Sequence, residues 1–125
     1  MKLTKIRIEL LNIFKNLNYP LSAEQIYEKV HERCNLSTIY RNLSYFEDKK
    51  IIRSMVFSDK IKYYYSGVGH FHFVYCNVCK NFEKINLCYE KEFENYLKNT
   101  LEFSVSDHVL YFEGVCKKCK NQKKL

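Results

Sequence analysis

The sequence predicts an α+β protein in which an N-terminal winged helix-turn-helix is followed by a small α/β domain with a four-cysteine zinc site. The first observation behind this fold class is the order of patterns in residues 1–66, three amphipathic helices and then a β-hairpin. The second is a pair of Cys-x-x-Cys motifs in the remainder. Each two-residue gap lets a turn present both sulfurs to one metal ion. An unspecialised small α+β domain is the alternative interpretation of the first pattern.

The first two expected helices are separated by a short break. Apolar side chains recur at helical spacing over residues 3–17, which predicts an amphipathic helix. Residues 18–21 contain the only proline and end that helix. Residues 22–25, Ser-Ala-Glu-Gln, have the form of a capping box, so a second helix is expected from there to about Arg33.

A third helix and a hairpin complete the first half. The helix is expected to begin at Ser37, or just before it, and to end near Lys50. Two β-rich runs follow, residues 51–57 and 61–65, with a turn between them. Three helices followed by a hairpin is the order of a winged helix-turn-helix.

The second half begins after a Gly-Val-Gly hinge and has a different pattern. We therefore expect a winged-helix domain over residues 1–66, a hinge at 67–69 and a second domain over 70–125. In that domain the expected elements are a His-rich strand before the first Cys-x-x-Cys, a strand over 82–87, an amphipathic helix over 89–101 and a strand over 103–112.

Composition and charge favour an anionic partner. The formal net charge of the 125 residues is +7, and residues 1–66 hold twelve Lys or Arg against seven Asp or Glu. There is no long apolar run and no signal peptide, so we expect a cytoplasmic protein with no membrane partner. In a reducing compartment, six cysteines are better explained as metal ligands with two spares than as three disulfides.

Basic side chains fall on the elements that meet phosphates in a winged helix, although such charges are often only a solvated face. The third helix also offers side chains that can bond base edges or phosphates, or touch a thymine methyl. The candidate DNA-binding residues are Lys2, Lys5, Arg7, Ser37, Thr38, Tyr40, Arg41, Asn42 and Lys60.

Two sets of side chains in the second half have the chemistry of metal ligands. The first set is Cys76, Cys79, Cys116 and Cys119, for which a redox dithiol or an incidental set of thiols is the alternative. The second begins with His70 and His72, which share one face of an extended strand, while Phe71, Phe73 and Tyr75 face the other way. One face of this strand thus has ligands and the other has core residues.

A series of motifs in this order resembles the ferric uptake regulator family of metal-responsive repressors, nearly from end to end. The motifs are Thr4-x-x-Arg7, Leu21-Ser-Ala-Glu24-x-x-Tyr27, Ser37-Thr-Ile-Tyr-Arg-Asn-Leu43, His70-x-His72, Cys76-x-x-Cys79, His108 and Cys116-x-x-Cys119. The resemblance implies a DNA-binding winged helix with Tyr40 and Arg41 on its recognition helix. It also implies an α/β dimerisation domain, and a homodimer on double-stranded DNA at an AT-rich inverted repeat.

The resemblance also indicates which metal sites to expect. The positions of the family's usual sensing site hold Pro20, Tyr64, Phe71 and Phe73, so that site is expected to be absent.

A second family site is matched by His70, His72 and His108 at their offsets from the cysteines, and by Glu90 if one residue is deleted after Cys79. Glu92 is the alternative to Glu90. Such a set would suit Zn²⁺ or Fe²⁺, ahead of Mn²⁺ or Co²⁺. Cys34 and Cys88 are expected to be small buried residues, with Cys88 as an alternative extra ligand or redox group.

The predicted function is a metal-dependent DNA-binding regulator, a repressor rather than an enzyme, with structural zinc at the four cysteines and the His/Glu site as sensor. Three alternatives stay open: a family member that binds DNA without metal control, a thiol redox protein, and a zinc-stabilised adaptor with no DNA role. The redox alternative is disfavoured because no thioredoxin-like βαβ context is present, and because a redox pair does not need a second pair.

Overall fold

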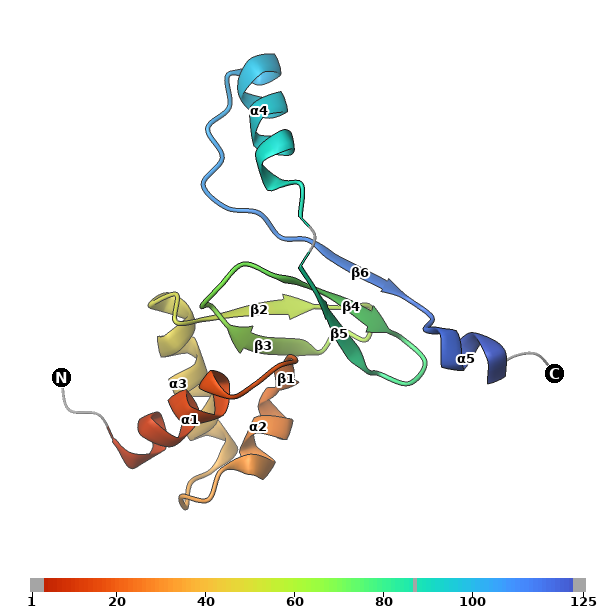
Figure 1. Ribbon diagram of the computed structural model, residues 1–125. Coiled ribbons are helices and arrows are strands. Elements are labelled where there is room, and N and C mark those ends of the chain that lie inside the picture. Colours follow the sequence, from red (N-terminus) through yellow and green to blue (C-terminus); the bar gives the residue numbers. More distant parts are fainter. Residues whose placement is uncertain (1–3, 87, 123–125) are drawn as a thin grey trace. The chain divides into compact units, whose positions relative to one another are not determined.

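The computed structural model describes residues 4–86 and 88–122, and the chain divides into two compact units, Met1–His70 and Phe71–Leu125 (Figure 1). Each unit contains its own three-stranded sheet together with helices. The fold is therefore of the α+β class that the sequence predicts. Within the described residues, no helix combines the length and the apolar composition needed to cross a bilayer.

The first unit is a winged helix. Its elements are α1 (Lys5–Lys15), β1 (Leu21–Ser22), α2 (Ala23–Lys29), α3 (Leu36–Asp48), β2 (Ile52–Val56) and β3 (Lys62–Ser66). Strand β3 lies between β1 and β2 and is antiparallel to both. The three helices and the hairpin are confirmed, whereas β1 was not predicted, because two residues are too few to show any periodicity.

Side-chain caps decide where these helices begin. The Thr4 hydroxyl accepts a hydrogen bond from the backbone N–H of Arg7 (3.2 Å) at the start of α1. At the start of α2 the predicted capping box is present: Ser22 Oγ accepts from the N–H of Gln25 (3.2 Å), and Gln25 Oε1 accepts from the N–H of Ser22 (2.9 Å). Helix α3 is capped by Asn35. Each cap satisfies N–H groups that have no partner within the helix.

The predicted end of the second helix near Arg33 was wrong, because α2 ends at Lys29 and Val30 is extended. The carboxylate of Glu9, on α1, accepts hydrogen bonds from the backbone N–H groups of His31 (2.6 Å) and Glu32 (3.0 Å). These bonds hold the pKa of Glu9 below its ordinary value. The backbone N–H groups after α2 thus bond to a side chain 22 residues earlier in the sequence and not to carbonyls within a helix. No local sequence pattern reveals this contact.

The core of the first unit is formed by apolar side chains from all of its helices and from its sheet. The buried members are Leu10, Phe14, Leu21, Ala23, Ile26, Ile39, Leu43, Phe46, Ile52 and Tyr64. They include members of the apolar stripes on which the helices were predicted, and other members, such as Ile6, Ile13 and Leu17 of the first stripe, are partly buried against them.

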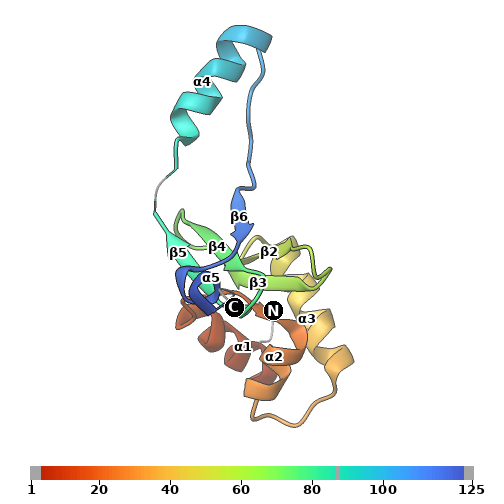
Figure 2. The ribbon, with the colours of Figure 1, turned by 90° about the vertical axis from the view of Figure 1, so that its right-hand side faces the viewer.

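The second unit is built around one central strand. Its elements are β4 (His72–Cys76), β5 (Phe82–Ile85), α4 (Glu90–Leu101), β6 (Tyr111–Gly114) and α5 (Lys117–Gln122). Strand β4 lies between the other two, antiparallel to β5 and parallel to β6 (Figure 2). Phe73 and Tyr75 are buried, as expected for the core-facing side of this strand.

The strand predicted over residues 103–112 was wrong for most of its length, since only its end belongs to β6. Apolar and polar side chains alternate over residues 103–106, but residues 103–110 have no ladder partner within the described chain. A strand requires a neighbouring edge as well as alternation. His108 consequently lies in a non-repetitive segment just before β6. Helix α5 was also not predicted, because it spans only six residues.

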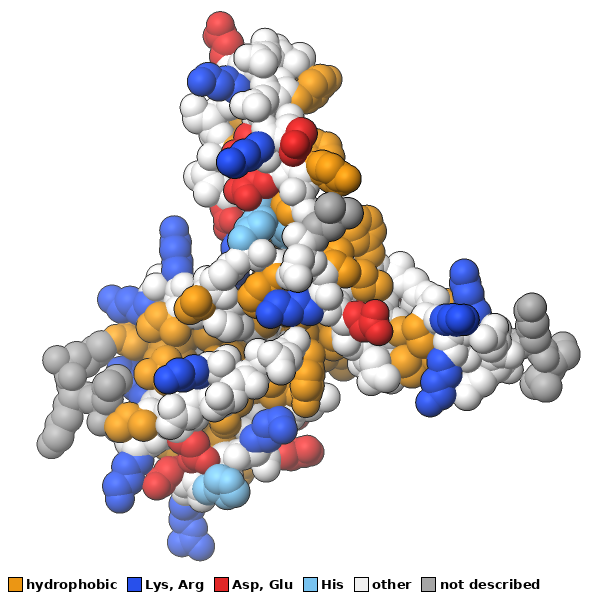
Figure 3. Space-filling view, in the orientation of Figure 1, with side chains coloured by type: hydrophobic (Ala, Val, Ile, Leu, Met, Phe, Trp, Pro, Cys, Tyr) orange, Lys and Arg blue, Asp and Glu red, His pale blue; other side chains and the backbone are white. Residues whose placement is uncertain are grey.

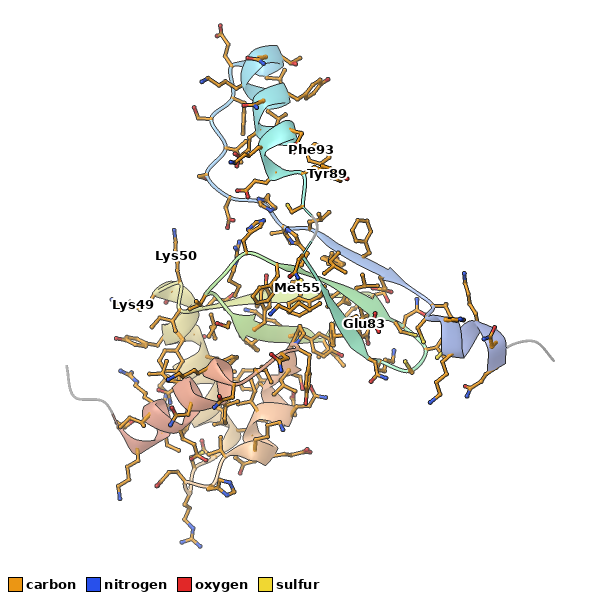
Figure 4. All side chains as sticks on the ribbon, in the orientation of Figure 1. Lys49, Lys50, Met55, Glu83, Tyr89 and Phe93 are labelled. Carbon is orange, nitrogen blue, oxygen red and sulfur yellow. The ribbon has the colours of Figure 1, made fainter. Side chains whose placement is uncertain are left out.

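Helix α4 presents apolar side chains at the surface. Phe93, Tyr96 and Leu101 are each more than 60% exposed, and no residue of α4 is buried. Figure 3 shows hydrophobic side chains at the surface around this helix, and Figure 4 shows Tyr89 and Phe93 together near its start. Exposed apolar groups of this size are typical of a surface that another protein covers.

Candidate metal centres

Strand β4 carries a candidate metal ligand at each of its ends, His72 at its first residue and Cys76 at its last. The two positions are four residues apart, which corresponds to roughly 13 Å along a strand. Because β5 and β6 flank β4, the segments next to them complete a separate cluster of ligand side chains at each end of the sheet.

The four cysteines meet at the C-terminal end of β4. Cys76 and Cys79 flank the turn that leaves this strand, and the parallel pairing of Cys76 with Gly114 brings the start of α5 to the same place. Cys116 and Cys119 are contributed from there. One sulfur from each of the four lies within 4.8 Å of the others, and Sγ of Cys79 is 3.9 Å from Sγ of Cys116. All six cysteines of the chain are free thiols.

These distances fit a tetrahedral ion. With Zn–S bonds of about 2.3 Å, the sulfurs of a tetrahedral site lie roughly 3.8 Å apart. A redox dithiol requires only one pair of thiols, whereas here both pairs converge on one point. The cluster therefore has the donor set and the spacing of a structural zinc site.

One of these sulfurs has a lowered pKa, which favours the thiolate form that binds a metal. Backbone N–H groups of Cys116 (3.4 Å) and Cys79 (3.5 Å) donate to Sγ of Cys76, and they lower the pKa of Cys76 to about 6. Burial raises the pKa of the Cys119 thiol to about 12, and hydrogen bonds with neighbouring thiols act in the same direction. Four adjacent thiols cannot all ionise unless a cation compensates their charge, which a divalent metal would do.

A second cluster lies at the other end of β4. His72 Nε2 is 3.3 Å from His108 Nε2, and Sγ of Cys88 is 3.2 Å from the former and 3.6 Å from the latter. A ring nitrogen of His70, two residues before β4, also lies within 4.8 Å of these three atoms. The structure thus brings together the three histidines that the sequence indicated.

The predicted carboxylate ligand lies elsewhere. Glu90 is the first residue of α4, and its Oε1 is 4.0 Å from Nδ1 of His108, the nitrogen on the other side of the ring from Nε2. Neither Glu90 nor the alternative Glu92 belongs to the group of converging ligand atoms found among the described residues. The fourth position is taken by the thiol of Cys88, which sequence reasoning assigned mainly to packing. Its place between β5 and α4, two residues from Glu90, was the available signal.

The positions of the family's usual sensing site have apolar or aromatic side chains that pack internally. Pro20 and Tyr64 are buried in the first unit, and Phe73 is buried in the second. Phe71 makes an edge-to-face contact with Phe73, with ring centroids 5.4 Å apart. Proline and phenylalanine have no donor atom, and burial raises the pKa of Tyr64, which keeps its phenol neutral and therefore a weak ligand.

The candidate DNA-binding residues fall into two groups in the first unit. Exposed side chains form the first group, which is Lys5, Ser37, Tyr40, Arg41 and Lys60, with Thr38 half-buried beside them. Figure 3 shows basic side chains spread over the surface of this unit. Lys60 lies in the turn between β2 and β3 with a φ of 64°. Lys2 lies outside the described residues.

The second group is engaged within the protein. The Nε–H of Arg7 donates to Oδ1 of Asn42 (2.9 Å), and the Arg7 guanidinium lies over the ring of Tyr45 at 4.0 Å. Asn42 is buried and also donates to the backbone carbonyl of Thr38 (2.9 Å). These contacts join α3 to α1, so the side chains of Asn42 and Arg7 are engaged within the first unit.

Comparison with known proteins gives one consistent result. A model of the ferric uptake regulator family matches residues 1–113. The ferric uptake regulation protein of Bacillus subtilis (strain 168) is 28% identical over 117 residues, covering 88% of this chain and 78% of the relative. A peroxide-responsive repressor of Staphylococcus epidermidis is 26% identical over 105 residues, covering 81% of this chain and 69% of the relative.

Solved structures show the same fold. The ferric uptake regulator of Francisella tularensis with iron superposes with a TM-score of 0.80 at 24% identity, covering 96% of this chain and 95% of that one. The Helicobacter pylori regulator, described as having three functional metal binding sites, superposes with a TM-score of 0.82 at 19% identity, covering 96% and 83%.

Proposed function

Because this chain belongs to the ferric uptake regulator family, we propose that it is a metal-responsive transcription regulator, and specifically a repressor. The observation that carries the proposal is the combination, in one chain of this family, of a winged helix whose α3 exposes Tyr40 and Arg41 and of two clusters of metal ligands. The proposed activity is regulated binding and requires no catalytic group. We place it in the cytoplasm, beside the chromosome.

In this proposal the exposed side chains of α3 read double-stranded DNA. Arg41 and Tyr40 enter the major groove from α3, where a guanidinium can bind a guanine edge with two hydrogen bonds. Lys5 and Lys60 contact phosphates, and Lys2 does so from before α1. The hydroxyl of Tyr40 donates to Oε1 of Glu24 on α2 (3.0 Å), which holds the ring of Tyr40 in place between the two helices.

The regulator is proposed to act as a homodimer formed through its second unit. The support is the exposed apolar face of α4, together with a hollow that is lined by α4 and by residues 103–110. A two-fold dimer presents two recognition helices at half-site spacing, so its target is an inverted repeat, which we propose to be AT-rich.

The two clusters are proposed to have different roles. A structural Zn²⁺ at the four cysteines would join β4, its following turn and α5, and so hold the second unit together. A second divalent metal at His70, His72 and His108 would favour the dimer geometry that binds DNA, by population shift between existing conformations. Zn²⁺ or Fe²⁺ suits the imidazoles better than Mn²⁺.

The proposal is tested by nuclease footprinting of the purified, metal-loaded protein on the DNA upstream of its own gene, at about 150 mM salt, because affinity at low salt includes much non-specific attraction. We expect a protected inverted repeat at protein concentrations that leave a scrambled fragment of equal length and composition unprotected. Equal protection of both fragments at every concentration would contradict a sequence-specific regulator.

A further inference from the structure

We infer that Cys88 is the thiolate ligand of the second metal site, which makes it a three-histidine, one-cysteine site selective for a thiophilic ion such as Zn²⁺ over Mn²⁺. The inference rests on the second metal site of the proposed function and names its fourth ligand. It also gives Glu90 a different part, as the group that orients His108 from outside the ligand set.

The spacing of the donor atoms is close to that of a tetrahedral metal site. A tetrahedral Zn²⁺ with Zn–N bonds of 2.0–2.1 Å and a Zn–S bond of about 2.3 Å places its nitrogens roughly 3.3 Å apart and each nitrogen roughly 3.6 Å from the sulfur. The nitrogens of His72 and His108 are 3.3 Å apart, and Sγ of Cys88 lies 3.2 and 3.6 Å from them. The N–N edge and one N–S edge thus agree with one face of a tetrahedral site, and the other N–S edge is about 0.4 Å shorter.

Hydrogen bonding alone explains this triangle less well. Nε2 of a neutral imidazole either donates one proton or accepts at one lone pair, and never does both. The two nitrogens and the thiol are joined by three short contacts, and at most two of these contacts can be good hydrogen bonds at the same time. A metal ion uses the lone pairs of all three atoms, and of His70, simultaneously.

The fold explains why Cys88, rather than Glu90, arrives at this point. His72 pairs with Ile85 at the end of β5, and Cys88 follows Ile85 by three residues. Glu90 comes two residues later, at the first position of α4, and its Oε1 is 4.0 Å from Nδ1 of His108. A carboxylate at the outer nitrogen of a ligating histidine fixes the ring orientation and makes the inner nitrogen a stronger ligand. Glu90 is thus a positioning residue.

Part of the site lies at the surface of the second unit. Cys88, Glu90 and His108 border the hollow between α4 and residues 103–110. Cys88 and His108 are both partly exposed.

The choice of thiolate determines which ions bind well. Thiolate is a soft ligand that favours Zn²⁺, whereas Mn²⁺ and Mg²⁺ prefer oxygen. A site with Glu90 as fourth ligand would bind Mn²⁺ more readily than a site with Cys88, so the two ligand sets can be distinguished by experiment.

Cobalt spectroscopy of the full-length protein tests this assignment. Protein that retains one zinc per chain after dialysis against a chelator is titrated with Co²⁺, and its zinc content is measured afterwards to show that the four-cysteine site has not exchanged. We expect one further Co²⁺ per chain with tetrahedral ligand-field bands. Its sulfur-to-cobalt charge-transfer band should have about a quarter of the intensity of a four-thiolate site, because one thiolate contributes instead of four.

Three matched variants complete the test. Cys88→Ser should lose the charge-transfer band and bind Zn²⁺ more than about 100-fold more weakly in chelator competition, since even outer partners of a ligand change affinity 10- to 100-fold. Glu90→Gln should keep the band and weaken binding by about 10-fold. Cys34→Ser, which lies outside both clusters, should match the unmodified protein.

The outcomes separate the inference from the proposed function, because the spectrum does not depend on DNA. Co²⁺ binding without a thiolate band, or with a band that persists in Cys88→Ser, overturns the assignment of Cys88 and leaves the regulator intact. Failure of the zinc-loaded protein to bind any Co²⁺ overturns both the inference and the second metal site. Loss of tetrahedral bands in Glu90→Gln with a retained thiolate band would also contradict it, because Glu90 would then be a ligand.

Discussion

Replacing Cys76 with serine is expected to remove the bound zinc and with it the folded dimer. Cys76 is buried, and its sulfur accepts two backbone N–H groups that lower the pKa of Cys76 to about 6. A serine hydroxyl ionises far less readily than a thiol and is a poor zinc ligand. Binding of a structural zinc contributes directly to the free energy of folding. Losing the zinc should therefore remove a large part of the stability of a unit of this size.

The measurement combines zinc content per chain, thermal unfolding followed by circular dichroism, and mass in solution by light scattering. We expect Cys76→Ser to contain less than one zinc per chain and to lose the dimer, whereas Cys34→Ser retains both. The first unit has its own core, so its helical signal should persist in the variant. A stable Cys76→Ser dimer without zinc would refute a structural role for the four-cysteine cluster.

Replacing Arg41 with alanine is expected to reduce specific DNA affinity more than any other change to a single exposed side chain of α3. The guanidinium is exposed on a helix that is held in place by the Arg7–Asn42 hydrogen bond and by the buried Ile39 and Leu43. Loss of a two-bond contact to a base costs about 1–3 kcal/mol, or roughly 5- to 150-fold, for each half-site.

Two further variants determine the origin of that loss. Arg41→Lys keeps the charge and loses the paired hydrogen bonds, so it should retain non-specific binding while discriminating poorly between operator and scrambled DNA. Lys98→Ala removes one positive charge from the second unit and should change affinity little. Fluorescence anisotropy with labelled duplexes at fixed salt measures all three, and unchanged operator affinity in Arg41→Ala would exclude its proposed role.

Much of the first unit could be predicted because its signals are local. The capping box at Ser22 and Gln25 and the apolar stripes of α1 and α3 each depend on residues that are near in sequence. The end of α2 could not be predicted, because it depends on Glu9 from another helix. The start of a helix is marked by residues near in sequence, so it can be predicted. The end of this helix depends on a distant side chain, so it cannot.

The two metal clusters also differ in how far their ligands can be recognised from residues that are near in sequence. A Cys-x-x-Cys spacing fixes two ligands by itself, and two such motifs suffice to suggest the four-cysteine site. The second cluster depends on how β5 and β6 flank β4, which brings Cys88 and His108 to His72. Its three histidines could be proposed from their offsets within a known family, whereas Cys88 could be placed only after the strand pairing was known.

The central claim is that metal at the second cluster controls DNA binding. Its most direct test compares the affinity of the zinc-loaded dimer for its operator with and without added divalent metal at about 150 mM salt, for the unmodified protein and for His108→Ala. The account predicts tight binding only when metal is added, and no such metal effect in His108→Ala. Equally tight binding without added metal, and in the variant, would contradict the claim and identify a family member that binds DNA without metal control.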